Sequence, residues 1–383
     1  MSLLLPLDFA HVSFTRPGWE ADPWKLLDAA RRWHAMDSLT LPAYDVRSFQ
    51  ARHTLRMSLS HLPPTTESVV HVLNDPLFRK GSAEHTEDPG GPVYRQIDRA
   101  VRRNAPIEIV LPSFAGRPHN PAAHRRVGPD LGELYALQRL KNIADAVKSF
   151  YEPGVIFTLI LDGRAYRPFY GYSDDEAMPY RANLERQITA LGAHGQLRLV
   201  DMHDIMAARS SELESIDELV RHEVRLAWES GAVAERDALV RALRQGTETT
   251  AISAAVIELY KSGAHEHIDL RRFFGEAETA MQERAEHTAF EYAVLMTKLR
   301  ELNVIAEAFE GAVRGTVHPK PGQYSPRLSD PRTTISPWHG VAIEQPDGSI
   351  VTRYEAVVYQ DFEDFTAVFV DGDEAPFYYK RRR

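Results

Sequence analysis

The seven residues Val155–Leu161 limit the fold of this chain more than any other segment. They read Val-Ile-Phe-Thr-Leu-Ile-Leu and are almost continuously apolar. Seven residues are short for a helix, and an uninterrupted apolar run of this length is typical of a strand buried on both faces of a parallel sheet. A second short β-branched run, Ile107–Leu111, stops at Pro112, so we expect a strand there as well.

A helical pattern separates these two strands. From Asp130 onwards apolar residues recur every three or four positions, and the pattern continues to about Phe150. Asp130 is a suitable N-cap, and Glu133 stands three residues later, which is the spacing of a capping box. The order of elements is therefore strand, helix, strand.

The same alternation continues, with a helix expected from Pro179 to about Leu191 and a strand from Leu197 to Val200. Strands that alternate with helices indicate a parallel sheet built from βαβ units. Ligands of such sheets bind at the carboxyl ends of the strands. The polar loops 112–129 and 162–175 both follow strands, so we expect the binding site at that edge.

The length of 383 residues exceeds that of one ordinary domain. We predict an α/β fold with a Rossmann-like domain at residues 1–205 that has an irregular N-terminal lead-in. Residues 206–383 are expected to begin with a helix-rich insertion and then to form an α+β region with antiparallel strands. The strands expected there are 311–318, 341–343, 350–359 and 365–370, with a hairpin turn at Asp347-Gly348.

The composition excludes several classes of protein. The net charge of −9 disfavours a nucleic-acid-binding protein, which usually has a basic excess. The chain has no cysteine, so disulfides, thiolate catalysis and zinc–sulfur sites are ruled out. No signal peptide or membrane span is evident, so we expect a cytoplasmic protein that binds no membrane. The terminal run Lys380–Arg383 is interpreted as a solvated tail.

Familiar short catalytic motifs are absent from the sequence. The sequence His265-Glu266-His267 could suggest a metal site, but Gly263 just before it favours a surface loop, and we expect no metal. A catalytic and a structural role stay equally open for the group Asp201, His203 and Asp204, which follows the third expected strand.

The loop between Phe114 and Asp130 is unusually basic. It places five cationic or titratable side chains just before a helix N-terminus: Arg117, His119, His124, Arg125 and Arg126. Cations together with the positive end of a helix dipole favour an anion such as phosphate. A solvated basic loop is the alternative, although the prolines of the loop favour a defined shape.

Several segments together resemble the isonitrile synthase family of pyoverdine and dityrosine biosynthesis. Residues 106–114 read PIEIVLPSF and residues 129–133 read PDLGE. The other matching segments keep the family's order and are residues 151–154 (YEPG), 162–164 (DGR), 174–180, 314–320 (RGTVHPK) and 337–340 (PWHG). The resemblance covers roughly residues 80–200 and 310–345.

This resemblance implies an enzyme of the carbon–carbon lyase type that uses neither a cofactor nor a metal. In the family, the α-amine of an amino acid condenses with the C2 ketone of ribulose 5-phosphate, and fragmentation of the imine leaves an isonitrile. The substrates would be an amino acid or related amine and a sugar phosphate, and a downstream oxygenase or peptide synthetase is a candidate partner. The groups implied for proton transfer are His339, Asp162, Glu133 and His318. Those implied for phosphate or substrate binding are Arg117, His119, Asn120, His124, Arg125, Asp130, Arg164, Arg314 and Lys320.

The loop also departs from the family pattern. Members usually carry FPxKSPN and a second lysine three residues later, whereas residues 114–120 here read FAGRPHN and Ala123 stands at the second lysine position. Arg117 preserves a positive charge but cannot act as a base. Two alternatives therefore stay open: another amine modification on the same fold, such as N-formylation, or a non-catalytic partner subunit.

Overall fold

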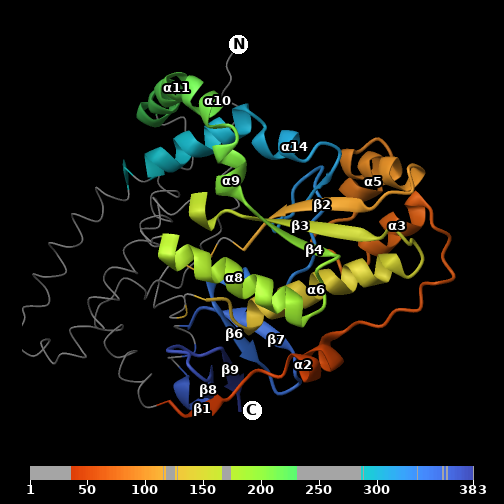
Figure 1. The fold of residues 1–383 in the computed structure, drawn as a ribbon, viewed down its shortest axis with the longest axis vertical. Coiled ribbons are helices and arrows are strands. Elements are labelled where there is room, and N and C mark those ends of the chain that lie inside the picture. The colour runs from red at the N-terminus through yellow and green to blue at the C-terminus, as the bar shows by residue number, and fades with distance from the viewer. Residues whose placement is uncertain are drawn as a thin grey trace, which may run out of the picture.

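Four parallel strands form the sheet that carries the predicted site. The computed structural model describes residues 36–114, 116–117, 126, 128–165, 174–230, 286–287, 289–333, 335–355, 358 and 361–382. The strands are β2 (Ile107–Pro112), β3 (Val155–Leu161), β4 (Leu197–Asp201) and β5 (Val313–Arg314), in the order β4-β3-β2-β5. Every neighbouring pair is parallel (Figure 1). The predicted parallel sheet is confirmed.

Helix α6 (Leu131–Lys148) connects β2 to β3 and begins with the predicted capping box. The Asp130 side chain accepts from the backbone of the first turn, and the Glu133 side chain accepts from the Asp130 N–H at 2.9 Å. Helix α8 (Asp174–Ala190) begins earlier than predicted, because Pro179 lies inside the helix and not at its first position. Proline is favoured at a helix start, which is why the sequence suggested a later beginning.

The second sheet is five-stranded and has the order β1-β8-β9-β6-β7. Its strands are β1 (Ser38–Leu41), β6 (Val341–Glu344), β7 (Ile350–Arg353), β8 (Phe365–Val370) and β9 (Tyr378–Arg381). The pairs β6–β7 and β8–β9 are antiparallel, as expected, while β1–β8 and β6–β9 are parallel. The strands predicted at 311–318 and 350–359 are shorter than expected, because pairing covers only Val313–Arg314 and Ile350–Arg353.

The interpretation of the C-terminal basic run as a solvated tail is wrong for its backbone. Strand β9 is hydrogen-bonded between β8 and β6, with Tyr379 fully buried. Lys380 and Arg381 lie in the same strand with exposed side chains. The two tyrosines that precede the basic residues fix the segment in the sheet, and the charged side chains remain in solvent.

Helix α6 lies between the two sheets (Figure 1). One hydrophobic core includes Leu137 of α6, Phe157 of β3 and Ala342 of β6, so the two sheets share it. Each sheet also takes strands from both parts of the chain, since β1 belongs to the second sheet and β5 to the first. The domain boundary at residues 205 and 206 stays a prediction, and it does not separate the two sheets.

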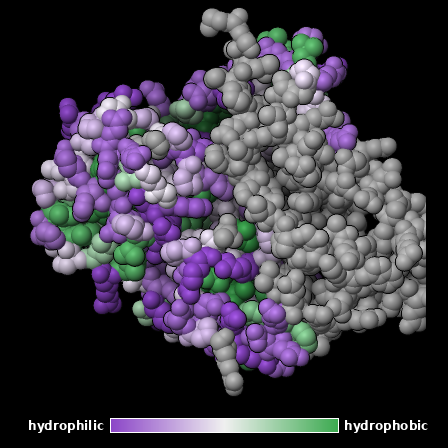
Figure 2. Space-filling view, turned by 180° about the vertical axis from the view of Figure 1, so that it is seen from behind, coloured by the Kyte–Doolittle hydropathy of each residue, from purple (hydrophilic) through white to green (hydrophobic). Residues whose placement is uncertain are grey.

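Further helices lie around the two sheets. They are α2 (Val46–His53), α3 (Thr66–Leu73), α4 (Glu84–Glu87), α5 (Pro92–Arg102), α9 (Met202–Ala207), α10 (Ser210–Ser215), α11 (Asp217–Glu229) and α14 (Val304–Ala308). Among the described helices, none has the length and apolar character needed to cross a membrane. The described surface seen in Figure 2 is mainly hydrophilic, with small separate hydrophobic areas.

Candidate functional site

Several predicted site residues within the described part of the chain lie near the carboxyl ends of the parallel strands. Strands β2, β3 and β4 end side by side, with Pro112 opposite Ile160 and Leu161 opposite Asp201. The loop after β2 leads to Arg117, and Asp162 directly follows β3. Two groups of ionisable side chains lie at this edge, the buried ion cluster and the strand-end cluster.

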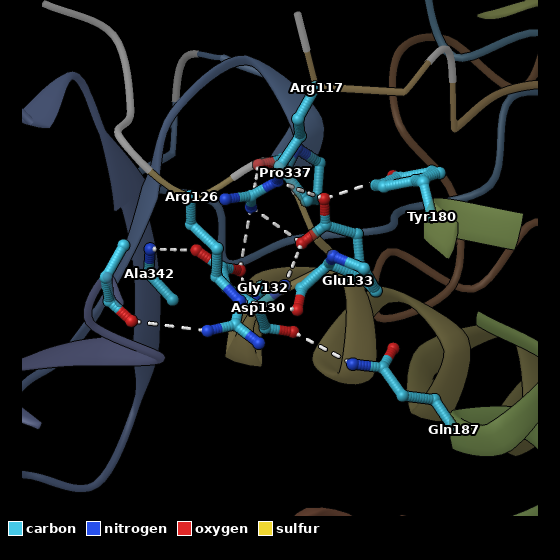
Figure 3. Close-up of polar contacts among 11 residues, drawn as sticks. Arg117, Arg126, Asp130, Gly132, Glu133, Tyr180, Gln187, Pro337 and Ala342 are labelled. Carbon is cyan, nitrogen blue, oxygen red and sulfur yellow. Dashed lines mark hydrogen bonds and ion pairs between the residues drawn. The ribbon is translucent and has the colours of Figure 1, made fainter. Parts of the chain in front are cut away.

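The buried ion cluster consists of Arg117, Asp130, Glu133 and Tyr180 (Figure 3). Arg117 donates from Nε to Oε1 of Glu133 at 2.6 Å and from Nη2 to Oε2 at 2.7 Å. Nη2 also lies 2.9 Å from Oδ1 of Asp130 and donates to the Pro337 carbonyl at 3.0 Å. The side chains of Arg117 and Glu133 are fully shielded from solvent. Two-point contacts of this kind fix a guanidinium rigidly against its carboxylate.

The buried ion cluster joins four parts of the fold. The Tyr180 hydroxyl of α8 donates to Glu133 at 3.1 Å, and Asp130 Oδ2 accepts from the Ala342 N–H of β6 at 3.0 Å. The Pro337 carbonyl brings in the short helix η2 (Pro337–His339). The contacts therefore hold the N-terminus of α6 against α8, η2 and the second sheet.

Burial dominates the titration of this cluster. It raises the pKa of Glu133 and the nearby Asp130 carboxylate adds to the rise, while the charge of Arg117 lowers the pKa. Burial also raises the pKa of the Tyr180 hydroxyl well above its usual value, and the Glu133 charge adds to this.

Two segments predicted to belong to one site are in direct contact. The rings of Phe114 and Trp338 lie 5.0 Å apart, centre to centre, and both side chains are buried. Phe114 adopts a left-handed backbone conformation with φ of 56°, which costs about 1–3 kcal/mol for a residue other than glycine. Surrounding contacts must hold this strained turn, and the Trp338 ring is one of them. His339 follows Trp338 directly and is half-buried.

The strand-end cluster contains Asp162, Arg164, Asp201 and Asp204. Arg164 Nη1 lies 3.5 Å from Oδ2 of Asp201 and 3.5 Å from Oδ1 of Asp204. Asp201 is buried and also caps α9 by accepting from the His203 N–H at 2.9 Å. This contact gives Asp201 a structural role, and its carboxylate faces the end of β3 as well.

Asp162 differs from the other carboxylates of the described residues at this edge. Its Oδ1 is shielded from solvent and has no hydrogen-bond partner among the residues that the structure describes. Burial raises the pKa of Asp162 to about 7, and the charge of Asp201 adds to the rise. Tyr292 lies close enough for the Asp162 charge to raise the pKa of its hydroxyl, in addition to the effect of burial. A carboxyl group with a pKa near neutrality can both accept and release protons under physiological conditions.

The third group of predicted residues lies around the end of β5. Arg314 is the last residue of this strand and pairs with Val110 of β2. The His318 N–H donates to the Thr316 hydroxyl at 3.2 Å, which fixes the turn that follows β5. Lys320 is partly exposed beyond this turn. These three residues lie on the other side of β2 from Asp162.

His119, Asn120, His124 and Arg125 lie outside the described residues, as does the sequence His265-Glu266-His267. The roles predicted for all site residues stay predictions. Sequence reasoning did not single out Tyr180 or the Pro337 carbonyl as parts of a site. Both lie inside segments that resemble the family, but only their tertiary contacts assign them to the buried ion cluster. Within the described part of the chain, no group of three or more His, Asp or Glu side chains could hold a metal ion.

Comparison with known proteins gives the family of this chain. The family model described as "Pyoverdine/dityrosine biosynthesis protein" matches residues 97–364, which is more than two thirds of the chain. The matched range contains the buried ion cluster, the strand-end cluster and η2. The chain therefore belongs to the pyoverdine/dityrosine biosynthesis protein family.

Relatives of known name support this assignment. An L-tyrosine isonitrile synthase of Pseudomonas aeruginosa is 24% identical over 298 residues, which are 74% of this chain and 86% of the relative. Isocyanide synthase A of Aspergillus fumigatus is 24% identical over 264 residues, covering 67% of this chain and 40% of the relative. The crystal structure of the PvcA protein from Pseudomonas aeruginosa is similar in fold, with a TM-score of 0.62 and 22% identity over 82% of this chain and 99% of that one.

Proposed function

We propose that this chain is an isonitrile synthase that converts the α-amino group of an amino acid to an isonitrile, with ribulose 5-phosphate as the carbon donor. Membership of the family and the names of the relatives support the isonitrile product. The carbon donor and the assignment as a carbon–carbon lyase follow the resemblance described above.

The observation that carries the proposal is the state of Asp162. The reaction needs a group that removes and returns protons while the imine forms and its carbon–carbon bonds break. Asp162 lies at the carboxyl end of β3, has an oxygen without a hydrogen-bond partner among the described residues, and has a pKa of about 7. In its ionised form it is suited to act as the general base.

The buried ion cluster would act differently from Asp162. The oxygens of Glu133 accept hydrogen bonds from Arg117, Asp130 and Tyr180, and the side chain is fully shielded from solvent. These contacts favour Glu133 and Arg117 as positioning residues that fix the loop after β2 and the start of α6. His339 lies next to the Trp338 ring and remains the candidate imidazole for proton transfer near the buried ion cluster.

The test is an activity assay with the purified full chain. Each of the twenty amino acids is incubated with ribulose 5-phosphate, and phosphate release and product mass are measured. Formation of an isonitrile together with phosphate from at least one amino acid supports the proposal. A product that carries an N-formyl group would instead support a different amine modification, and absence of any product would support the non-catalytic alternative.

A further inference from the structure

A pair of basic side chains lies beyond β5, at the outer border of the four-stranded sheet. Two irregular segments continue the sheet there: Gly315 pairs with Tyr324 in parallel, and Arg79 pairs with Pro326 in antiparallel orientation. The Lys80 N–H donates to the Ser325 carbonyl at 2.9 Å, and the Arg327 N–H donates to the Phe78 carbonyl at 2.7 Å.

These two hydrogen bonds flank the Arg79–Pro326 bridge on either side. Residue 80 therefore stands opposite residue 325, and residue 78 stands opposite residue 327. Opposite residues share a face of a sheet, as do residues two apart along a strand. The side chains of Phe78, Lys80, Ser325 and Arg327 consequently belong to one face, on which Phe78 is buried. We call Lys80, Ser325 and Arg327 the basic border.

No carboxylate balances the basic border within the described residues. The Lys80 ammonium contacts the Val317 carbonyl at 3.4 Å, and Arg327 Nε contacts the Pro76 carbonyl at 3.0 Å. Elsewhere in this acidic chain, many arginines face carboxylates, as Arg126 faces Asp373 at 2.7 Å. The charge of Arg327 also acts on Lys80, and two neighbouring cations without a carboxylate partner among the described residues produce a positive potential that attracts an anion.

The surroundings increase this positive potential. Arg139 of α6 donates to the Arg327 carbonyl at 3.3 Å, and its guanidinium approaches the same segment. Burial and the charge of Arg327 lower the pKa of Lys80. The repulsion between these cations is relieved when an anion binds between them.

A buried hydroxyl without a partner marks the same place. Ser325 is only 4% exposed, and its Oγ has no hydrogen-bond partner among the described residues. Leaving a buried hydroxyl without a hydrogen-bond partner is unfavourable. A phosphate oxygen between the two cations would accept this hydroxyl's hydrogen bond after a small local adjustment.

The basic border lies next to the carboxyl end of β5. Lys80 reaches back to Val317, and its neighbour Gly81 packs tightly on Pro319.

We propose that Lys80, Arg327 and Ser325 bind the phosphate group of a phosphate monoester. The two cations neutralise the phosphate charge, and the Ser325 hydroxyl donates to one oxygen.

Binding is tested without catalysis, by calorimetric titration of the full-length protein with ribulose 5-phosphate alone and with inorganic phosphate alone. Lys80→Ala and Arg327→Ala are each expected to weaken binding of both ligands by about tenfold or more. Lys380→Ala, which removes an exposed cation from the other sheet, serves as the matched control and is expected to bind like the wild type. Thermal unfolding shows whether each variant is folded, and a Lys80→Gln variant repeats the test with a smaller loss of packing.

Loss of binding in folded Lys80 and Arg327 variants, with normal binding in Lys380→Ala, supports the phosphate site. Unchanged binding in folded Lys80 and Arg327 variants, or a wild type that binds neither ligand, overturns it.

Discussion

The guanidinium of Arg117 and the carboxylate of Glu133 face each other through two parallel hydrogen bonds of 2.6 and 2.7 Å, out of contact with solvent. They come from the loop after β2 and from the first turn of α6. The sequence indicated Arg117 as a ligand for phosphate, whereas its contacts are with the protein itself. The pair holds together the edge of the sheet where the substrates are proposed to bind.

Replacement of Arg117 by alanine is expected to destabilise the fold strongly. It leaves the carboxylates of Asp130 and Glu133 buried without their cation, and breaking a buried ion pair on one side costs about 3–5 kcal/mol. Urea unfolding measures the loss. Arg332→Ala is the control, because Arg332 pairs with Asp330 near the surface and its side chain is 50% exposed, so little change is expected. Equal losses in both variants would contradict the role given to the buried pair.

Arg117→Lys tests whether the two-point geometry matters. Lysine keeps the charge and is the residue that the family usually has at this position, but it cannot reproduce the paired contacts. We expect a loss of stability smaller than that of Arg117→Ala, because the carboxylates keep a counter-charge. A variant as unstable as Arg117→Ala would show that geometry, rather than charge, holds the cluster.

Asp162→Asn is expected to lower turnover by at least about a hundredfold, which is the usual size of a general-base contribution. In the wild type, kcat should rise with pH through about 7, as the Asp162 carboxyl ionises. Asp201→Asn removes a negative charge that raises the pKa of Asp162, so the midpoint of this rise should move to lower pH. A midpoint that stays in place, or moves upward, argues against Asp162 as the titrating group.

The free energy of unfolding should also depend on pH because of the raised pKa of Asp162. The pKa of Asp162 is higher in the folded chain, at about 7, than the value of about 3.9 expected in an unfolded chain. Its contribution to stability is therefore fully present below pH of about 4 and is lost as the pH rises through about 7. Between pH 5.5 and 8, the wild type should lose roughly 1–2 kcal/mol relative to Asp162→Asn in urea unfolding. A constant difference between the two proteins across this range would refute the raised pKa.

Gly340 provides a test of the contact between η2 and the second sheet. A Cβ atom at this position would lie 2.4 Å from the Arg353 carbonyl oxygen and 2.6 Å from the Ile335 side chain. Gly340→Ala should therefore push η2 and its Pro337 carbonyl away from Arg117, with losses in both stability and activity. Gly195→Ala is the control, because no atom lies within 4 Å of the added Cβ. Normal activity in the Gly340 variant would show that the position of η2 is unimportant.

Strands β2 and β3 and helix α6 could be predicted because their signals are local. An apolar run, a helical repeat and the Asp130–Glu133 capping box each occupy one short stretch of sequence. Strand β9 could not be predicted in the same way. Its neighbours β6 and β8 are separate segments of the chain, and the basic residues that follow Tyr379 resemble a solvated tail.

The candidate site shows the same limit. The sequence indicated Asp162 through its place after a strand and Arg117 through its place in a basic loop. It could not show that the Arg117 guanidinium forms ion pairs with Asp130 and Glu133, because these contacts depend on how the loop folds back on α6. Tyr180 and Pro337 join the cluster from still more distant segments.

The origin of the isonitrile carbon shows most directly whether the chain is an isonitrile synthase that uses ribulose 5-phosphate. The purified chain is incubated with its amino acid and with ribulose 5-phosphate labelled with carbon-13 at C2, and the product is examined by mass spectrometry and carbon NMR. We expect an isonitrile whose terminal carbon carries the label, formed by the wild type and strongly reduced in Asp162→Asn. An unlabelled product, or equal product from the Asp162 variant, would contradict this expectation.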